Sequence, residues 1–319
     1  MDGLTALSAA ASTTLAAPVV VRYLNRAGYL DHPGARSSHT APTPRGGGLA
    51  VLGGLAVAVG IAMSGGRAWP SVVILPALAL AAVGLFDDRH QGGVSASFRL
   101  AAQVALGIVA GSIVVGPWGA ALGAAVVPVI VNVVNFMDGI NGITALTLVA
   151  WGASTLVANG VLGSVFGVQF LALITVGTAV GFLPWNLPRA RLFLGDVGSY
   201  LYGGLVAGAI LLAWGTPLRW AVIAPLAPYL ADVSLTLLRR ARRGARLTEA
   251  HREHTYQRLV HETGLTHTKA SACVAFAALC SGMPFALGWH GAAGVLVAGS
   301  VVTLYLALPA LRGRIAHRA

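Results

Sequence analysis

Residues 118–135 have the sequence WGAALGAAVVPVIVNVVN, and the polar turn MDGING follows at residues 137–142. The run carries no charged side chain and is close to the length of about 20 residues that a helix needs to cross a bilayer. Polar groups are costly at membrane depth, so a polar cluster at the end of such a run marks a functional position. This pattern indicates a membrane-spanning helix with a functional end.

The composition of the whole chain extends this conclusion. Of 319 residues, 56% are hydrophobic and only 10% are charged, whereas a typical soluble domain carries about 25% charged residues. Ten acids and twenty-one bases are too few to form the polar shell of a soluble protein. We therefore expect an all-α fold, a polytopic transmembrane helical bundle that forms a single domain over residues 1–319.

Ten or eleven spans are expected, because eleven apolar segments are present. They lie near residues 4–24, 47–64, 69–86, 98–115, 118–135, 142–158, 162–184, 197–214, 217–238, 269–288 and 292–311. Nineteen of the 21 bases fall after odd-numbered segments, and only Arg67 and Arg219 fall after even-numbered ones. Bases collect on the cytoplasmic side, so the N-terminus is predicted outside and the C-terminus in the cytoplasm. The net charge of +11 thus reports topology and does not indicate nucleic-acid binding.

Four of the ten acids fall at the cytoplasmic ends of predicted spans: Asp87, Asp88, Asp138 and Asp196. Asp87 and Asp88 end an apolar run, where a helix C-terminus already carries partial negative charge. A bound cation would relieve this repulsion. The alternative is a solvated helix end with Arg89 as the partner of the acids.

Asp196 follows a glycine and opens the span at 197–214. Glycines at a helix N-terminus let backbone N–H groups approach a phosphate, although Asp196 could instead simply be the N-cap of this helix. Asn132 and Asn135 lie three residues apart and should share one face of a helix end. These polar residues place the expected active site on the cytoplasmic face.

The longest predicted loop, 239–268, is strongly basic and contains His251, Arg252 and His254. A basic loop beside a membrane usually contacts lipid headgroups. His251 and His254 are three residues apart, so on a helix they would share a face and could point together into a site. The functional and the lipid-contact interpretations both remain open on these residues alone.

Several stretches, taken in their order along the chain, resemble one known enzyme group. They are SHTAPTPRGGG at 38–48, FDDR at 86–89, RLAAQ at 99–103, NVVNFMDGING at 132–142, FLGDVGS at 193–199 and HREHTYQRL at 251–259. They are similar to the polyprenyl-phosphate N-acetylhexosamine-1-phosphate transferase superfamily, glycosyltransferase family 4. The last stretch looks most like the branch that starts O-antigen chains with an N-acetylated deoxyhexosamine.

The resemblance implies transfer of a sugar-1-phosphate from a UDP-N-acetylhexosamine to undecaprenyl phosphate, with release of UMP. It also implies a multi-pass protein of the bacterial inner membrane, surrounded by membrane lipid, and leaves a homodimer open. Mg²⁺, or Mn²⁺ in its place, would bind Asp196 with support from Asp138, and Asp87 and Asp88 would position or deprotonate the lipid phosphate. The expected substrate-binding residues are Arg45, Asn135, Asn141, Asn186, Phe193, His251, Arg252 and His254.

Two departures and two alternatives accompany the resemblance. Asn141 stands where many relatives have a second Asp, so an acid–base role is excluded there, although an amide can still bond a uracil edge. The triple histidine of the phospho-MurNAc-pentapeptide translocases is absent, which disfavours this peptidoglycan alternative. A secondary transporter is disfavoured because no internal repeat is seen and the acids gather at one interface, whereas transporters place ionisable groups near the midplane.

Overall fold

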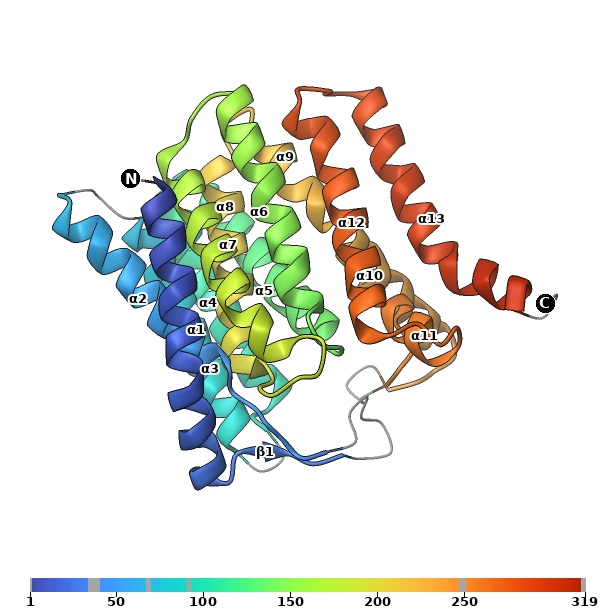
Figure 1. Cartoon of the computed structure of the whole chain (residues 1–319). Coiled ribbons are helices and arrows are strands. Elements are labelled where there is room, and N and C mark those ends of the chain that lie inside the picture. The colour runs from blue at the N-terminus through green and yellow to red at the C-terminus, as the bar shows by residue number, and fades with distance from the viewer. Residues whose placement is uncertain (1, 34–40, 67–69, 91–92, 247–250, 317–319) are drawn as a thin grey trace.

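The computed structural model describes residues 2–33, 41–66, 70–90, 93–246 and 251–316. Helices of alternating direction account for nearly all of the regular structure (Figure 1). The helices are α1 (Asp2–Ala27), α2 (Gly48–Ser64), α3 (Ser71–Arg89), α4 (Ala96–Val115), α5 (Gly119–Met137), α6 (Ile143–Val161), α7 (Phe166–Asn186), α8 (Gly195–Ala213), α9 (Arg219–Ile223), α10 (Ala227–Arg242), α11 (Thr255–His261), α12 (His267–Ala286) and α13 (Ala292–Ala316). Two short strands, β1 (Leu30–Asp31) and β2 (Thr43–Pro44), pair antiparallel. The all-α prediction is confirmed.

The number of spans also agrees with the sequence. Among the described residues, ten helical segments are long and apolar enough to cross a membrane. The predicted segment at 47–64 forms α2, which has only 17 residues and therefore a length of about 26 Å, somewhat less than the roughly 30 Å of a hydrocarbon core. The prediction of ten or eleven spans is confirmed, with α2 as the short member.

The predicted span at 217–238 is not one continuous helix. A 3₁₀ turn, Ala224–Leu226, separates α9 from α10. Pro225 and Pro228 lie in this region, and proline cannot donate the backbone hydrogen bond that a regular helix requires. The indole Nε1 of Trp151 donates to the Val222 carbonyl at 2.9 Å, so this carbonyl next to the break is satisfied.

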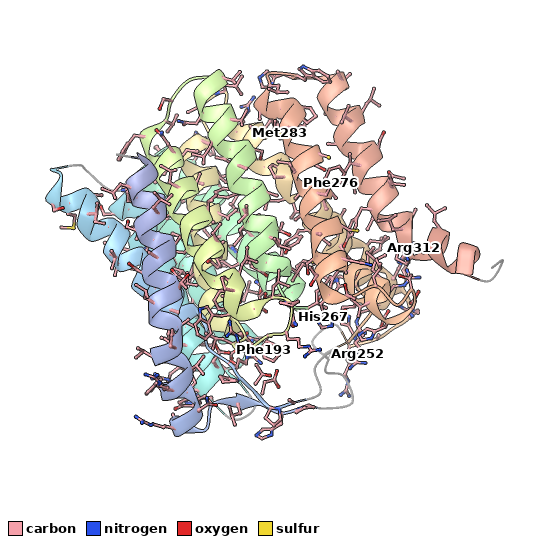
Figure 2. The ribbon with its side chains drawn as sticks, in the orientation of Figure 1. Phe193, Arg252, His267, Phe276, Met283 and Arg312 are labelled. Atoms are coloured by element: carbon pink, nitrogen blue, oxygen red, sulfur yellow. The ribbon has the colours of Figure 1, made fainter. Side chains whose placement is uncertain are left out.

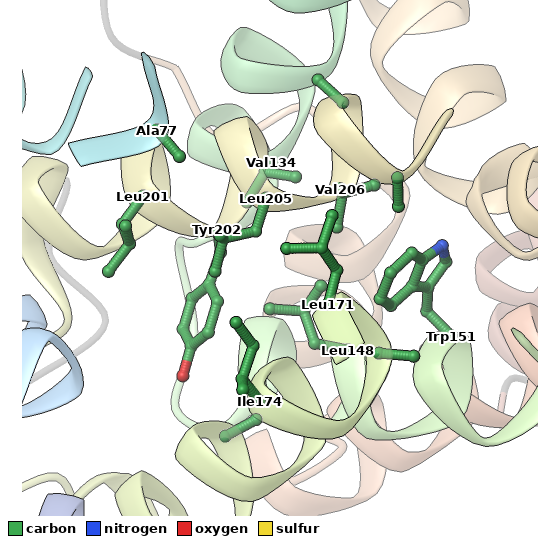
Figure 3. Packing of buried hydrophobic residues seen from close by; sticks show 14 of the residues in the cluster. Ala77, Val134, Leu148, Trp151, Leu171, Ile174, Leu201, Tyr202, Leu205 and Val206 are labelled. Carbon is green, nitrogen blue, oxygen red and sulfur yellow. The ribbon is translucent and has the colours of Figure 1, made fainter. Parts of the chain in front are cut away.

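Helix α8 is the centre of the bundle, and nearly all of its residues are buried. A helix that is apolar on every face belongs in a protein interior. Figure 3 shows Tyr202, Leu205 and Val206 of α8 packed against Leu171 of α7 and Trp151 of α6. Because α8 is central, its first turn is surrounded by the ends of neighbouring helices.

Helices α10 to α13 share a second hydrophobic cluster. It contains Tyr229 of α10, Tyr256 of α11, Val274 of α12 and Tyr305 of α13, each with no more than 2% of its surface exposed. In Figure 1 these helices form the orange and red group at one side of the bundle. This cluster holds the short helix α11 against the ends of the longer helices.

Candidate active site

The acids of α3 and α8 meet because these helices pack very closely. A Cβ atom at position 84 of α3 would lie only 2.3 Å from the backbone oxygen of Asp196, so any side chain larger than the hydrogen of Gly84 would force the helices apart. Asp87 and Asp88 follow within the next turn of α3. The contact therefore brings both carboxylates to the first turn of α8.

Asp196 is not the N-cap of α8, contrary to one expectation. The helix begins at Gly195, its N-cap is Leu194, and Asp196 lies in the first turn. Asp88 instead accepts a hydrogen bond from the backbone N–H of Val197 at 3.0 Å. A carboxylate from another helix thus satisfies one of the N–H groups that the start of α8 leaves unpaired. Gly195 has φ +75° and lies against Asp88, a position that only glycine fills without strain.

Arg45 bridges two of the acids. Its Nε lies 2.9 Å from Oδ1 of Asp88, and its Nη2 lies 2.6 Å from Oδ1 of Asp196. The residue follows β2 and is placed by the neighbouring backbone, since Phe193 N donates to the Pro44 carbonyl at 2.8 Å. Burial opposes protonation, but the carboxylates of Asp196 and Asp88 raise the pKa of Arg45 above its ordinary value.

Asp87 has a different cationic partner. Its Oδ2 lies 2.7 Å from Nη1 of Arg99, which also lies 3.9 Å from Oδ2 of Asp196. The expected partner, Arg89, donates instead to the Tyr23 hydroxyl at 3.3 Å. The alternative of a solvated helix end neutralised by Arg89 is therefore wrong, because both acids turn toward α8.

The side chains of the acids are closed off from solvent, whereas those of the arginines are partly open to it. The side chains of Asp88, Asp87 and Asp196 are 4%, 7% and 9% exposed, whereas those of Arg45 and Arg99 are 44% and 30% exposed. An anion that enters from solvent would therefore meet the arginines first. We call these five residues the carboxylate–arginine cluster.

The cluster also bears on metal binding. Among the described residues, no group of three or more His, Cys, Asp or Glu side chains is arranged to hold a metal ion. The donor chemistry nevertheless fits a hard divalent cation, because three buried carboxylates outnumber two guanidinium groups and supply oxygen ligands. A cation would have to share these oxygens with the arginines.

Asn135 and Asp138 lie beside the cluster at the end of α5. Asn135 Nδ2 donates to Oδ1 of Asp196 at 3.1 Å and to Oγ of Ser199 at 2.9 Å. Asp138 accepts from the Thr144 hydroxyl at 2.6 Å, and burial raises its pKa to about 7. Asn132, expected on the same face as Asn135, bonds Gln103 of α4 instead.

Asn141 and Asn186 connect two turns near the cluster. Asn141 Nδ2 donates to the Pro188 carbonyl at 3.1 Å. The buried amide of Asn186 accepts from Gly142 N at 2.5 Å and donates to the Leu192 carbonyl at 3.0 Å. Phe193 follows directly in this loop and is half-buried. These bonds fix the turn after α5 against the loop before α8.

His251 and His254 come together, but not on a helix as expected. His254 is the N-cap of α11 and His251 lies in the preceding loop, because the helix begins only at Thr255. Their ring centroids are 4.9 Å apart. Burial, together with the neighbouring His254 ring and the guanidinium of Arg240, lowers the pKa of His251 to about 4. Figure 2 shows Arg252 of this loop at the same end of the molecule as Phe193.

Comparison with known proteins decides the family. The sequence model of glycosyl transferase family 4 matches residues 70–214. Decaprenyl-phosphate N-acetylglucosaminephosphotransferase of Mycobacterium tuberculosis (strain ATCC 25618 / H37Rv) is 30% identical over 315 residues, covering 83% of this chain and 77% of the relative. This chain belongs to glycosyl transferase family 4. It is therefore a multi-pass membrane transferase of the polyprenyl-phosphate hexosamine-1-phosphate transferase superfamily, and the resemblance to this superfamily is confirmed.

Two further relatives of this transferase carry different names. The probable undecaprenyl-phosphate N-acetylglucosaminyl 1-phosphate transferase of Bacillus subtilis (strain 168) is 26% identical over 268 residues, covering 78% of this chain and 74% of the relative. A phospho-N-acetylmuramoyl-pentapeptide-transferase of Synechococcus sp. (strain JA-3-3Ab) is 33% identical over 238 residues, with coverages of 66% and 67%. The names of the relatives from Mycobacterium tuberculosis and Bacillus subtilis specify N-acetylglucosamine, whereas the name of the relative from Synechococcus specifies phospho-N-acetylmuramoyl-pentapeptide.

Two residues of this transferase have no role assigned from the sequence, yet the structure gives them defined partners. Arg99 pairs with Asp87, and Asp232, fully buried in α10, accepts from the Tyr305 hydroxyl at 2.6 Å and from Thr255 N at 2.9 Å. An acid inside a predicted span was a signal available for Asp232. The residues Ser38–Thr40 of the first quoted stretch lie outside the described residues.

Proposed function

We propose that this transferase moves an N-acetylhexosamine-1-phosphate from a UDP-sugar to undecaprenyl phosphate, releasing UMP and starting an O-antigen or another cell-envelope polysaccharide. The names of the relatives from Mycobacterium tuberculosis and Bacillus subtilis support the reaction class. The observation that carries the proposal is the Arg45 bridge between Asp88 and Asp196, since it joins phosphate-binding and proton-accepting groups at one helix end.

In the proposed reaction an oxygen of the lipid phosphate attacks the β-phosphorus of the UDP-sugar. The new P–O bond forms as the bond between the β-phosphorus and the bridging oxygen breaks, and UMP leaves with that oxygen. Two anionic substrates must approach each other, so positive groups that face the developing charge lower the barrier. Arg45 and Arg99, the exposed members of the cluster, occupy the positions from which they would meet these phosphates.

The same arginines would control the acids. When a substrate phosphate binds Arg45 and Arg99, their ion pairs with Asp88 and Asp87 weaken, and both carboxylates become free to orient the lipid phosphate or to accept its proton. Asp196 and Asp138 would hold Mg²⁺, for which Mn²⁺ can substitute. Such an ion supplies charge neutralisation at the phosphates when bound.

The remaining residues are proposed to bind the donor. Asn135, Asn141 and Phe193 lie around the cluster and are assigned to the nucleotide, with Phe193 offering a ring for stacking on uracil. Asn186 contributes by holding the two turns together, since both ends of its amide bond the backbone. His251, Arg252 and His254 are assigned to the diphosphate or the sugar. The membrane would be the bacterial inner membrane, with this end of the bundle in the cytoplasm.

The relative from Synechococcus favours a second candidate, a transferase for phospho-N-acetylmuramoyl-pentapeptide. A donor panel separates the two. Purified protein is incubated with undecaprenyl phosphate, Mg²⁺ and, in turn, UDP-N-acetylglucosamine, UDP-N-acetylfucosamine and UDP-N-acetylmuramoyl-pentapeptide, and UMP release is followed. We expect release with an N-acetylhexosamine donor lacking the peptide. Turnover of the pentapeptide donor alone would establish the second candidate, and release from none of the three would contradict both.

A further inference from the structure

A basic pocket lies at the C-terminal end of α10, where this helix meets α11. Its volume is about 550 Å³. It is lined by Thr236, Arg239, Arg242, Arg243, Arg252, Glu253, Arg258 and Glu262. Five arginines and two glutamates give the lining a formal excess of three positive charges, and none of these residues belongs to the carboxylate–arginine cluster. The pocket is therefore distinct from the carboxylate–arginine cluster, and Arg252 is the one lining residue that is also assigned to the donor.

The glutamates of the pocket are already paired within the protein. Arg258 binds both oxygens of Glu262, at 2.8 and 3.0 Å. Glu253 binds Arg240 at 2.8 Å and also contacts Arg243. Arg239 and Arg242 have no ion pair with an acid among the described residues. The positive charge of these two arginines is thus available to a ligand from outside the chain.

The surface of α10 indicates what kind of anion fits. Leu238 is 47% exposed, and it lies one turn before Arg242 on the exposed face that begins with Ser234. The apolar span that contains α10 extends to Arg242. An exposed leucine followed directly by exposed arginines is the order of groups found where a helix leaves the hydrocarbon and enters the headgroup layer.

We propose that this pocket binds the phosphate headgroup of an anionic membrane phospholipid, with Arg239 and Arg242 contacting the phosphate and Leu238 contacting the acyl chain. Basic pockets at the cytoplasmic ends of membrane helices commonly recognise such headgroups. A soluble phosphate carries the same charged group as the headgroup, but it has no acyl chain that could contact the exposed leucine. The bound lipid would brace the junction of α10 and α11.

The proposal is tested with the full-length protein in nanodiscs that contain phosphatidylglycerol and phosphatidylcholine. The measured quantity is the phospholipid that stays bound after extraction, determined by native mass spectrometry. The wild type should retain phosphatidylglycerol in preference to phosphatidylcholine. The double variant R239Q/R242Q should retain phosphatidylglycerol about twenty-five-fold more weakly, because each arginine near a membrane surface contributes about fivefold.

A matched control removes one charge from the opposite end of the same span. Arg219→Gln, at the start of α9, should retain phosphatidylglycerol like the wild type. Equal retention of both phospholipids by the wild type, or unchanged retention by R239Q/R242Q, overturns the proposal. A third arm adds inorganic phosphate during extraction. If inorganic phosphate displaces phosphatidylglycerol from the wild type, the pocket is a soluble-phosphate site and the lipid assignment is wrong.

Discussion

Arg45 is the residue on which the arrangement of the acids depends. A single guanidinium group contacts Asp88 through Nε and Asp196 through Nη2, so it holds together carboxylates from α3 and α8 that would otherwise repel each other. Arginine suits this position because its planar group presents several donors in fixed directions. The Arg45 side chain is 44% exposed, so a substrate phosphate that reaches it can replace one carboxylate.

The first prediction concerns this bridge. Arg45→Lys should lower UMP release by about two orders of magnitude, because one ammonium group cannot contact both acids and a phosphate in the geometry that a guanidinium allows. The protein should remain folded, since the charge is kept. Arg22→Lys, an exposed change in α1, is the control and should be without effect. Activity of Arg45→Lys within threefold of the wild type would show that the bridge is not needed.

At this scale the sequence indicated acids that the structure brings together, but it did not indicate their partners. Acids are costly at the ends of spans, and this argument singles out Asp87, Asp88 and Asp196 without any tertiary structure. The pairing of Asp87 with Arg99 in place of Arg89 depends on how α3 and α4 pack. Asp232 is visible in the sequence as an acid inside a span, but its four hydrogen-bonding neighbours come from α10 itself, from α13 and from the start of α11.

At the scale of elements, the short helix α11 is held by one buried acid. Asp232 of α10 accepts from Thr255 N, at the first residue of α11, and lies 3.3 Å from Nδ1 of the N-cap His254. Its other oxygen accepts from Tyr305 of α13 at 2.6 Å. Because isolated helices of this length are unstable in water, this contact positions the whole 251–261 segment.

The second prediction follows from these bonds. Asp232→Asn should lower the free energy of unfolding by about 1–3 kcal/mol. Both oxygens of Asp232 accept hydrogen bonds, so the NH₂ group of asparagine would face a donor and one buried hydrogen-bonding group would lose its partner. Thermal unfolding in detergent measures the effect. Ser234→Ala, an exposed change on the same helix, serves as the comparison and should leave the melting temperature unaltered. Equal melting temperatures for both variants would mean that Asp232 does not hold α11.

The third prediction is a dependence of stability on pH. The pKa of His251 is lowered to about 4 in the folded protein, whereas in the unfolded chain it is near 6.5. Between these values the unfolded chain binds more protons, so the contribution of His251 to stability is present above pH 6.5 and is lost as the pH falls. His251→Gln should therefore show a smaller fall in melting temperature from pH 7 to pH 5 than the wild type. An identical fall in both would contradict the lowered pKa.

The sequence anticipated the long helices well and the irregular elements poorly. Apolar runs near the length of a bilayer leave the backbone no alternative to a helix, so the spans were found with small errors at their ends. The 3₁₀ turn at Ala224–Leu226 arises where two prolines interrupt the helix. From the sequence alone, such a pair of prolines predicts a kinked helix as readily as a break. The helix expected through His251 and His254 starts later, because Asp232 fixes its first residue from a distant position.

At the scale of the whole molecule, the polar turns around the carboxylate–arginine cluster lie together at one end of the helical bundle. In Figure 1 the chain begins at one end of the bundle and α13 ends at the other, which agrees with an odd number of passes when α2 is included. The basic connections and the carboxylate–arginine cluster then share a side. This arrangement is what an enzyme needs if a soluble nucleotide-sugar and a membrane lipid are to meet at one site.

The fourth prediction concerns this topology. Reporter proteins fused after Arg243 and after Arg314 should indicate the cytoplasm, and a reporter fused after Gly215 should indicate the opposite side. The prediction rests on the distribution of bases: nineteen fall on one side of the spans and two fall on the other. A reporter after Arg243 that is active outside the cytoplasm would reverse the orientation and separate the site from cytoplasmic nucleotide-sugars.

The most direct test of the central claim is UMP release by Asp196→Asn, with undecaprenyl phosphate, Mg²⁺ and the donor that the wild type uses. Asp196 lies at the point where Arg45, Arg99 and Asn135 converge, so loss of its charge should remove turnover while the protein stays folded and membrane-inserted. Asp87→Asn and Asp88→Asn should each lower the rate by at least about two orders of magnitude. UMP release from Asp196→Asn at nearly the wild-type rate would contradict the account.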